Sequence, residues 1–300
     1  MRNRQSSLAS AGSRRPYLEA VRAYYNETWK DYRGAWMNRR NRAIHFGYWT
    51  PSTRTHAASL IDMNRVLASR VGLRPGEHVL DAGCGVGGSA MWLAEEYGAR
   101  VIGITLVGDQ VERARRYSNE RGLGHLVAFE QQDYLRTSFP DATFDVVWAQ
   151  ESLCHAPDKR AFFVEAHRVL KPGGRLVVEE YLRFRECYPE RDERLLHSWF
   201  TGWMIPNLLT GEQALRCARD VGFVDVALED LTPQVRRSLR RLYRIVVGFY
   251  PVVYPLYLLG FRSEVQHGNA RGSRDQWRAS KRGLWFIAIL TARKPDRETW

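Results

Sequence analysis

The chain has 300 residues, of which 44% are hydrophobic, with 24 glycines and 12 prolines. That length allows a full hydrophobic core, and the composition is that of an ordinary globular protein, which excludes a chain too short or too polar to fold. Four cysteines lie far apart, without a CxxC pair or a metal-ligand spacing near a histidine. We therefore expect one main domain with reduced thiols, located in the cytoplasm.

The net charge is +12, from 45 basic and 33 acidic side chains, and only five of the basic residues are lysines. The planar guanidinium of arginine suits phosphate and carboxylate groups, so an anionic ligand is one explanation. A compositional bias of the genome explains the arginines equally well. A nucleic-acid partner is the weakest explanation, because the charge is spread along the chain rather than gathered in one run.

Two segments raise the question of targeting or membrane contact. Residues 1–16 are rich in serine and arginine without an apolar stretch, and we expect a disordered tail there rather than a secretory signal. Residues 243–261 are long and apolar, but Arg244, two prolines and two glycines interrupt them. We expect no integral membrane span, and we favour a buried or substrate-lining segment over contact with a membrane surface.

The first predicted elements are two helices. Charged and aromatic residues alternate at helical spacing over residues 17–36, and a second pattern covers residues 57–71 and ends before Gly72. Together they form an N-terminal helical lead-in.

Strands and helices alternate in the next part of the chain. Helical stretches cover residues 89–97, 109–121 and 159–170. Short β-rich runs precede and follow them, beginning near His78, Ala99, Val127, Phe144 and Gly174. Strand and helix alternating at this interval predict an α/β protein with a parallel, doubly wound sheet.

The pattern changes after residue 181. A helix over residues 211–221 leads to a strand at 224–228, and a final strand follows at 284–292. The interval between these two strands is expected to be a cap insertion that contributes to the acceptor site. The expected organisation is a disordered tail, a helical lead-in, a cofactor-binding core, a cap insertion and a final core strand, over residues 1–16, 17–72, 73–230, 231–283 and 284–295.

A glycine-rich turn follows the first predicted strand. Asp81, Gly83, Gly85, Gly87 and Gly88 lie between an apolar run and a helical stretch. Glycines let the backbone bend sharply and approach a ligand closely, while N–H groups at the helix start face that ligand. A mere tight turn is the alternative interpretation, and dinucleotide-binding enzymes use a related loop, so the turn alone does not identify a ligand.

Three segments, matching in order and spacing across residues 79–178, resemble class I S-adenosylmethionine-dependent methyltransferases. The glycine-rich turn resembles their first motif, Gln131-Gln132-Asp133 resembles their adenine-contacting acidic motif, and residues 168–174 resemble the turn before their fifth strand. The resemblance implies a Rossmann-like, seven-stranded, mostly parallel sheet with helices on both faces, and S-adenosylmethionine as the cofactor. It implies cofactor-binding roles for Asp81, Gly83, Gly85, Gly87, Thr105, Gln110, Gln132, Asp133 and Ala149.

The end of the second strand departs from the family pattern. An acid for the ribose hydroxyls is usual there, but this chain has Thr105. Thr105 or Gln110 would substitute as hydrogen-bonding groups, as in relatives that act on lipids and isoprenoids. The missing carboxylate also argues against NAD, whose ribose relies on it.

Two further segments resemble sterol, tocopherol and prenyl diphosphate C-methyltransferases. They are residues 41–49 and residues 148–158. The resemblance implies a small hydrophobic acceptor, and our leading hypothesis is C-methylation of an isoprenoid alkene, with an anionic prenyl diphosphate as the first candidate. Methylation of a phenol or quinol ring, or of another small natural product, is the alternative.

Alkene methylation requires two things of the protein. The tertiary carbocation left by methylation can be stabilised by aromatic faces, and a base must then remove a proton. Glu151, just beyond the fourth strand, is the expected base, with a solvated or ion-paired carboxylate as the alternative. His155 is a second candidate base or an orienting partner. Glu180 is the third candidate catalytic residue, and both Glu179 and Glu180 are ranked below Glu151 because alternation sends only one of them inward.

Aromatic and basic side chains are the candidates for the acceptor site, since the chain has ten tryptophans and fourteen tyrosines. Arginines from 236 to 244 are spaced to form one basic helical face, which is either solvated or a clamp for a diphosphate, with or without Mg2+ whose ligands the sequence does not identify. The predicted substrate-binding residues are Tyr25, Trp29, Arg42, His45, Tyr48, Trp49, Trp199, Trp203 and Arg244.

The segment after the fourth predicted strand bears on a nucleic-acid acceptor. Enzymes that methylate amino groups of nucleic-acid bases commonly have an Asn/Asp-Pro-Pro-aromatic run after the fourth strand, where this chain has Ala149-Gln-Glu-Ser. We therefore expect no nucleic-acid partner. Relatives often associate through their N-terminal helices, so a homo-oligomer is expected, and a non-catalytic binding role stays open as an alternative.

Overall fold

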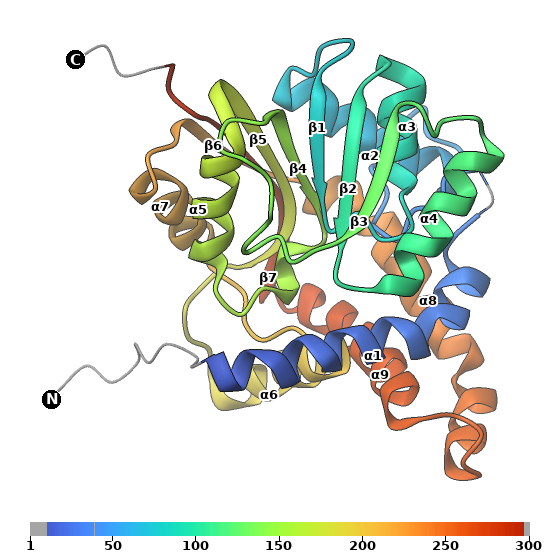
Figure 1. Ribbon diagram of the computed structural model, residues 1–300. Helices are drawn as coiled ribbons and strands as arrows, with labels where there is room; N and C mark the ends of the chain where they lie inside the picture. Colours follow the sequence, from blue (N-terminus) through green and yellow to red (C-terminus); the bar gives the residue numbers. More distant parts are fainter. Residues whose placement is uncertain (1–10, 39, 297–300) are drawn as a thin grey trace, which may run out of the picture.

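A seven-stranded sheet lies at the centre of the computed structural model, which describes residues 11–38 and 40–296 (Figure 1). The strand order is β3-β2-β1-β4-β5-β7-β6, and β7 runs antiparallel to both of its neighbours while the other paired strands are parallel. The predicted doubly wound, mostly parallel sheet is confirmed. The strands are β1 (His78–Ala82), β2 (Arg100–Thr105), β3 (Val127–Gln131), β4 (Phe144–Gln150), β5 (Leu170–Arg183), β6 (Val224–Asp230) and β7 (Trp285–Arg293).

Helices cover both faces of the sheet. One face packs against α2 (His56–Val71), α3 (Gly88–Tyr97) and α4 (Gly108–Glu120). The other face packs against α5 (Lys159–Val169) and α7 (Gly211–Asp220). Side chains of β5 pack into both layers, because successive residues of a strand point to opposite faces of the sheet. This alternation determines which acidic residues of β5 face the site.

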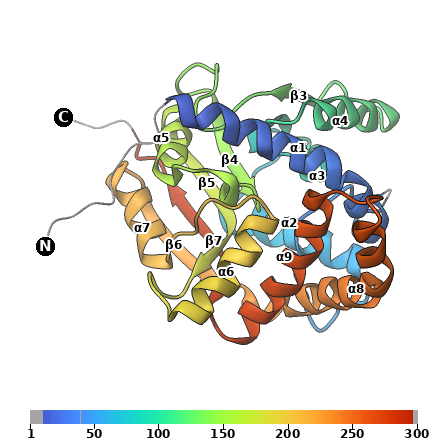
Figure 2. The same cartoon turned by 90° about the horizontal axis from the view of Figure 1, so that it is seen from below.

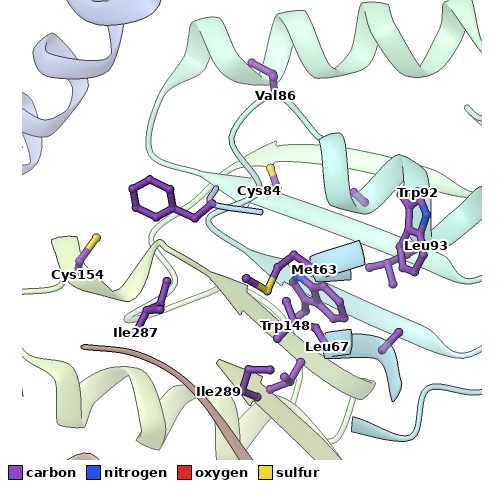
Figure 3. Close-up of a cluster of buried hydrophobic side chains, with 14 of the residues drawn as sticks. Met63, Leu67, Cys84, Val86, Trp92, Leu93, Trp148, Cys154, Ile287 and Ile289 are labelled. Atoms are coloured by element: carbon purple, nitrogen blue, oxygen red, sulfur yellow. The ribbon is translucent and has the colours of Figure 1, made fainter. Parts of the chain in front are cut away.

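The first of these layers contains the larger buried cluster. Met63 and Leu67 of α2 lie beside Trp148 of β4, with Ile289 of β7 below them and Ile287 of β7 to the left (Figure 3). All five side chains are at most 1% exposed. Burial of a Leu, Ile or Met side chain contributes about 1.5–3 kcal/mol, so this cluster fixes α2 firmly against the middle of the sheet.

Four helices form an additional layer beside the sheet: α1 (Ala11–Ala35), α6 (Glu190–Gly202), α8 (Thr232–Leu258) and α9 (Glu264–Lys281). Figure 1 places α1, α6 and α9 below the sheet, and Figure 2, seen from below, places them in front of it. Helices α8 and α9 occupy the late insertion, between β6 and β7. Among the described residues, no helix combines the length and the apolar character that crossing a membrane requires.

Two details of the N-terminal and middle regions differ from expectation. Helix α1 begins at Ala11, so the last part of the expected disordered tail is helical, and residues 1–10 lie outside the described residues. Helix α6 was not predicted, although its first turn carries Glu190, Asp192 and Glu193 after Pro189, a pattern that favours a helix start.

Candidate active site

A cavity of about 630 Å³ lies at the carboxyl ends of β1, β2 and β4, where parallel sheets commonly bind ligands. The glycine-rich turn after β1, the ends of β2 and β4, and helices α1, α8 and α9 all contribute to its wall. Helix α1 is joined to α9 across this space, because the hydroxyl of Tyr24 donates to Oδ1 of Asn269 at 2.8 Å. The cavity is therefore closed by elements that are distant in the sequence.

The glycine-rich turn is shaped by close contacts. Gly83 has φ +93°, and a Cβ there would lie 2.3 Å from Cβ of Ser152, so only glycine fits. Gly85, with φ +54°, lines the cavity as well. Gly87 does not line the cavity. A Cβ at Gly87 would lie 2.5 Å from the ring of Phe129, so glycine at this position lets α3 approach the sheet.

Asp81 supplies the charge at this end of the cavity. It is 2% exposed, and its Oδ2 atom has no hydrogen-bond partner among the described residues. Burial raises the pKa of Asp81 to about 7, while the amide of Ala90 lowers it. A buried carboxylate oxygen that lines a cavity without a partner fits a cationic group of a ligand, such as the ammonium of an amino acid.

Polar side chains from β2 and β4 complete this end. The hydroxyl of Thr105 donates to Oε1 of Gln110 at 2.7 Å, and both residues line the cavity. Gln150, at the end of β4, also lines it and accepts from Ser89 Oγ at 2.8 Å. The pair of Thr105 and Gln110 thus stands where the sequence predicted a replacement for the usual acid.

The predicted cofactor residues Ala149, Gln132 and Asp133 lie outside the cavity lining formed by the described residues. Ala149 points to the opposite face of the sheet, among the residues packed against α5 and α7, so its neighbour Gln150 takes the predicted place. Gln132 accepts from the amide of Ser138 and Asp133 from that of Leu135, which occupies both side chains in the local turn.

Glu151 lies directly after β4 and faces the cavity. Its φ of 47° places a non-glycine residue in the left-handed region, which costs of the order of 1–3 kcal/mol and is concentrated at functional sites. Its carboxylate accepts from the amide of Phe46 and from the hydroxyl of Tyr181. Burial raises the pKa of Glu151 to about 8, although both hydrogen bonds lower it.

The two glutamates of β5 lie on opposite faces of the sheet. Glu179 shares the face of Val177 and Tyr181, next to Glu151, and is 0% exposed. Glu180 shares the face of Val178 and accepts from the amides of Cys154 and Tyr181. Alternation thus turns Glu179, and not the candidate Glu180, to the face that carries Tyr181, and neither glutamate is among the described residues that line the cavity.

His155 has both ring nitrogens engaged. Nδ1 lies 3.1 Å from the carbonyl oxygen of Met204, and Nε2 lies 2.7 Å from the hydroxyl of Tyr25. A carbonyl only accepts, so Nδ1 carries the proton and Nε2 accepts from Tyr25. Burial lowers the pKa of His155 to about 4. This arrangement favours an orienting role for His155 over a role as the base.

The predicted substrate residues separate into two groups. Tyr25, Arg42, His45 and Trp203 line the cavity. The remaining five lie outside the cavity lining: Trp29, Tyr48, Trp49, Trp199 and Arg244. Of these, Arg244 is exposed on the surface.

The supporting tryptophans have specific contacts elsewhere. Trp29 lies under the guanidinium of Arg113, and Trp199 packs at 0% exposure against Trp285. Trp49 donates from Nε1 to Ser238 Oγ at 2.9 Å, which ties its loop to α8. The partners Arg113, Ser238 and Trp285 also lie outside the cavity lining, so these three tryptophans stabilise other parts of the fold.

Several lining residues were not predicted from the sequence. Arg241 of α8 lines the cavity instead of Arg244, and donates to the carbonyl oxygen of Ala35 at 3.1 Å. The sequence contains a pattern that indicates this face of the helix, because the apolar lining residues Ile245 and Phe249 follow Arg241 at intervals of one helical turn. Trp36 lines the cavity too, in agreement with the expectation of an aromatic wall. The unpredicted aromatic lining residues are Tyr24, Tyr32, Phe46, Tyr134 and Tyr181.

Comparison with known proteins agrees with this site. The family described as "Methyltransferase domain" matches residues 80–178. Sarcosine/dimethylglycine N-methyltransferase of Halorhodospira halochloris is 30% identical over 230 residues, which cover 76% of this chain and 80% of that protein. The chain belongs to the class I S-adenosylmethionine-dependent methyltransferase family.

Other relatives differ in what their names say they do. Sterol 24-C-methyltransferase of Eremothecium gossypii is 35% identical over 218 residues, covering 71% of this chain. The match spans 57% of that protein, so this chain corresponds to somewhat over half of its length. The crystal structure of the [4+2]-cyclase SpnF has a TM-score of 0.77 at 28% identity, over 93% of this chain and 97% of that one.

Proposed function

We propose that this protein transfers a methyl group from S-adenosylmethionine to an alkene carbon of an isoprenoid, and that Glu151 then removes a proton to restore the alkene. The observation that carries the proposal is the half-buried carboxylate of Glu151 at the end of β4, in the wall of a cavity that is also lined by aromatic side chains and by Asp81. The sterol C-methyltransferase among the relatives supports the choice of an alkene carbon.

The donor end of the cavity follows from the glycine-rich turn. Asp81 would bind the ammonium of the donor's amino-acid part, and Thr105 with Gln110 would bind its ribose hydroxyls. Bound there, S-adenosylmethionine supplies an activated methyl group on its sulfonium. The chain's own work is to hold the acceptor in line with that methyl and to exclude water.

The acceptor end supplies aromatic faces and one base. Tyr24, Tyr25, Trp36 and Phe46 line the wall near Glu151 and suit a positive charge that develops on carbon. The carboxylate of Glu151 accepts the proton that leaves the neighbouring carbon. Tyr181 holds that carboxylate in place through its hydroxyl.

A prenyl diphosphate is the acceptor that we test first. Arg42 and Arg241 both line the cavity and make no ion pair with a described residue, and Nε of Arg42 is buried without a partner there. Arg262 is different, because Asp31 neutralises it at 2.7 Å. Two guanidiniums without an ion pair, in a wall that also carries many aromatic and aliphatic side chains, suit an anionic end on a hydrophobic ligand.

Mg2+ enters no step of this proposal. The described residues contain no group of three His, Cys, Asp or Glu side chains placed to hold a metal ion. Of the acids in the cavity wall, Asp31 is paired with Arg262, while Asp81 and Glu151 belong to different ends. The donor set of the protein therefore does not define a metal site.

Acceptor trials with methyl-labelled S-adenosylmethionine test the proposal. We expect label in the products from geranyl or isopentenyl diphosphate, and none in products from phenols of the tocopherol type. Label in the phenols alone would reject the alkene acceptor. Conversion of an alkene without uptake of label would reject methyl transfer and would favour a reaction of the cyclase kind.

A further inference from the structure

The end of α8 and the turn that follows it carry a contiguous set of exposed apolar side chains. Phe249, Val252, Leu258, Leu259 and Phe261 are between 59% and 76% exposed. Figure 1 shows this end of α8 extending away from the sheet at the lower right. Large exposed apolar patches are rare on monomers and mark contact with a partner or a membrane.

Packing within the chain accounts for the opposite side of this helix end. The ring of Tyr257 stacks on that of His267 of α9, with centroids 4.2 Å apart, and Tyr254 lies against the same histidine. The tyrosines thus hold the helix end on α9. The apolar residues on the outer side have no such partner to explain them.

The charge along α8 beside this patch is positive, while Glu264, after the turn, accepts from the hydroxyl of Tyr257 and lies 3.9 Å from Arg271. Residues 231–262 contain no aspartate or glutamate. Arg240 and Arg244 are exposed on α8, one helical turn apart, and neither makes an ion pair with a residue that the structure describes. An apolar helix end flanked by unpaired arginines is typical of a helix that lies in the interface of an anionic membrane.

The patch also adjoins the cavity. Phe249 lines the cavity while remaining 62% exposed, and Val253 lines it one turn further along α8. The helix therefore connects the outer apolar surface to the cavity wall. This continuity, together with the charge, favours a lipid surface over a polar protein partner.

We propose that residues 247–261 dock on an anionic membrane surface, with Leu258, Leu259 and Phe261 entering the lipid and Arg240 and Arg244 contacting its phosphates. Docking would place the cavity mouth against the membrane, so that an apolar acceptor passes directly between them. The docking does not depend on the proposed reaction. Only the passage of an apolar acceptor from the membrane to the cavity rests on the proposed function.

Co-flotation of the full chain with vesicles tests the docking. Binding is expected with vesicles of phosphatidylglycerol and phosphatidylcholine, and at least tenfold less binding with phosphatidylcholine alone. The variant Leu258→Ser/Leu259→Ser/Phe261→Ser removes apolar groups outside the cavity lining and is expected to bind anionic vesicles at least tenfold less.

Two further variants separate the contributions. Arg240→Gln/Arg244→Gln is expected to weaken binding to anionic vesicles and to reduce its dependence on salt. The control Val164→Ser/Phe184→Ser removes apolar groups that are 43% and 50% exposed on another part of the surface, and is expected to bind as the unaltered chain does.

Three outcomes would overturn the docking proposal. The first is absence of binding to anionic vesicles, and the second is equal binding by the triple serine variant when circular dichroism shows it folded. The third is a dimer in light scattering that the triple variant dissociates while vesicles are not bound, because the patch would then join two copies of the chain.

Discussion

At the residue scale, Glu151 combines partial burial, a strained backbone and two hydrogen bonds to its carboxylate. Glu151→Gln keeps the shape and removes the basic oxygen, so alkene methylation is expected to fall about 10²- to 10⁴-fold. Donor affinity is expected to stay unchanged in calorimetry, because the proposed donor contact is made by Asp81 and not by Glu151. Unchanged turnover would remove Glu151 from the role of base.

The pH dependence of turnover follows from the same carboxylate. Burial raises the pKa of Glu151 to about 8, so the form that accepts a proton accumulates as pH rises towards that value. We expect kcat to increase from about pH 6, to reach half of its maximum near pH 8 and to level off above about pH 9. Tyr181→Phe removes a hydrogen bond that favours the carboxylate, so the midpoint should move to higher pH, and a flat profile would contradict the assignment.

Asp81 is expected to strengthen donor binding while it lowers the stability of the ligand-free protein. Asp81→Asn removes a charge-assisted contact worth about 1.5–3 kcal/mol, so calorimetry should find binding of S-adenosylmethionine weakened at least tenfold. Because burial raises the pKa of Asp81 to about 7, the ligand-free protein loses stability as pH rises towards 7, and the asparagine variant should be no less stable at pH 8. Asp145→Asn, which alters a carboxylate paired with Lys171 outside the cavity lining, should keep full affinity.

At the scale of elements, one serine joins α8 to the loop that precedes α2. Ser238 is 0% exposed, and its Oγ atom accepts from the amide of Gly47 at 3.1 Å and from Nε1 of Trp49 at 2.9 Å. Ser238→Ala leaves two buried donors unsatisfied, which should lower the free energy of unfolding by about 1–3 kcal/mol in urea.

A buried serine on another helix is the matched control for that change. Ser118, 2% exposed, donates only within α4, to the carbonyl oxygen of Arg115. Ser118→Ala should therefore cost clearly less than Ser238→Ala. Faster hydrogen exchange along α8 in the Ser238 variant alone would locate the effect at this junction, and equal exchange in both variants would argue against it.

At the scale of the whole molecule, ligand binding should stabilise the fold, because the cavity wall joins the sheet to α1, α8 and α9. S-adenosylhomocysteine at a hundred times its Kd should add about 2.7 kcal/mol to the free energy of unfolding. Scanning fluorimetry should then find Tm raised by roughly 5 °C or more. NAD should leave Tm unchanged, and a Tm unaffected by either compound would contradict the donor site.

Much of this architecture follows from local pattern. Strands and helices alternate along the chain with the spacing that predicts a parallel sheet, and helix ends such as Gly72, with φ +61°, stop where their residue types require. Asp81 and the glycines of its turn were predictable for the same reason, since a bend of that kind depends on neighbours in the sequence.

The wall of the cavity depended on contacts between distant segments. Alternation predicts that Ala149 and Gln150 point to opposite faces, as Glu179 and Glu180 do, but only the packed layers decide which face carries the site. Likewise, the arginine spacing on α8 predicts a basic face, while the position of α1 decides that Arg241 turns inward. The sequence by itself determined the sheet and the donor-binding turn because local interactions specify them, and the tertiary structure decided the acceptor side because its residues meet only when the chain has folded.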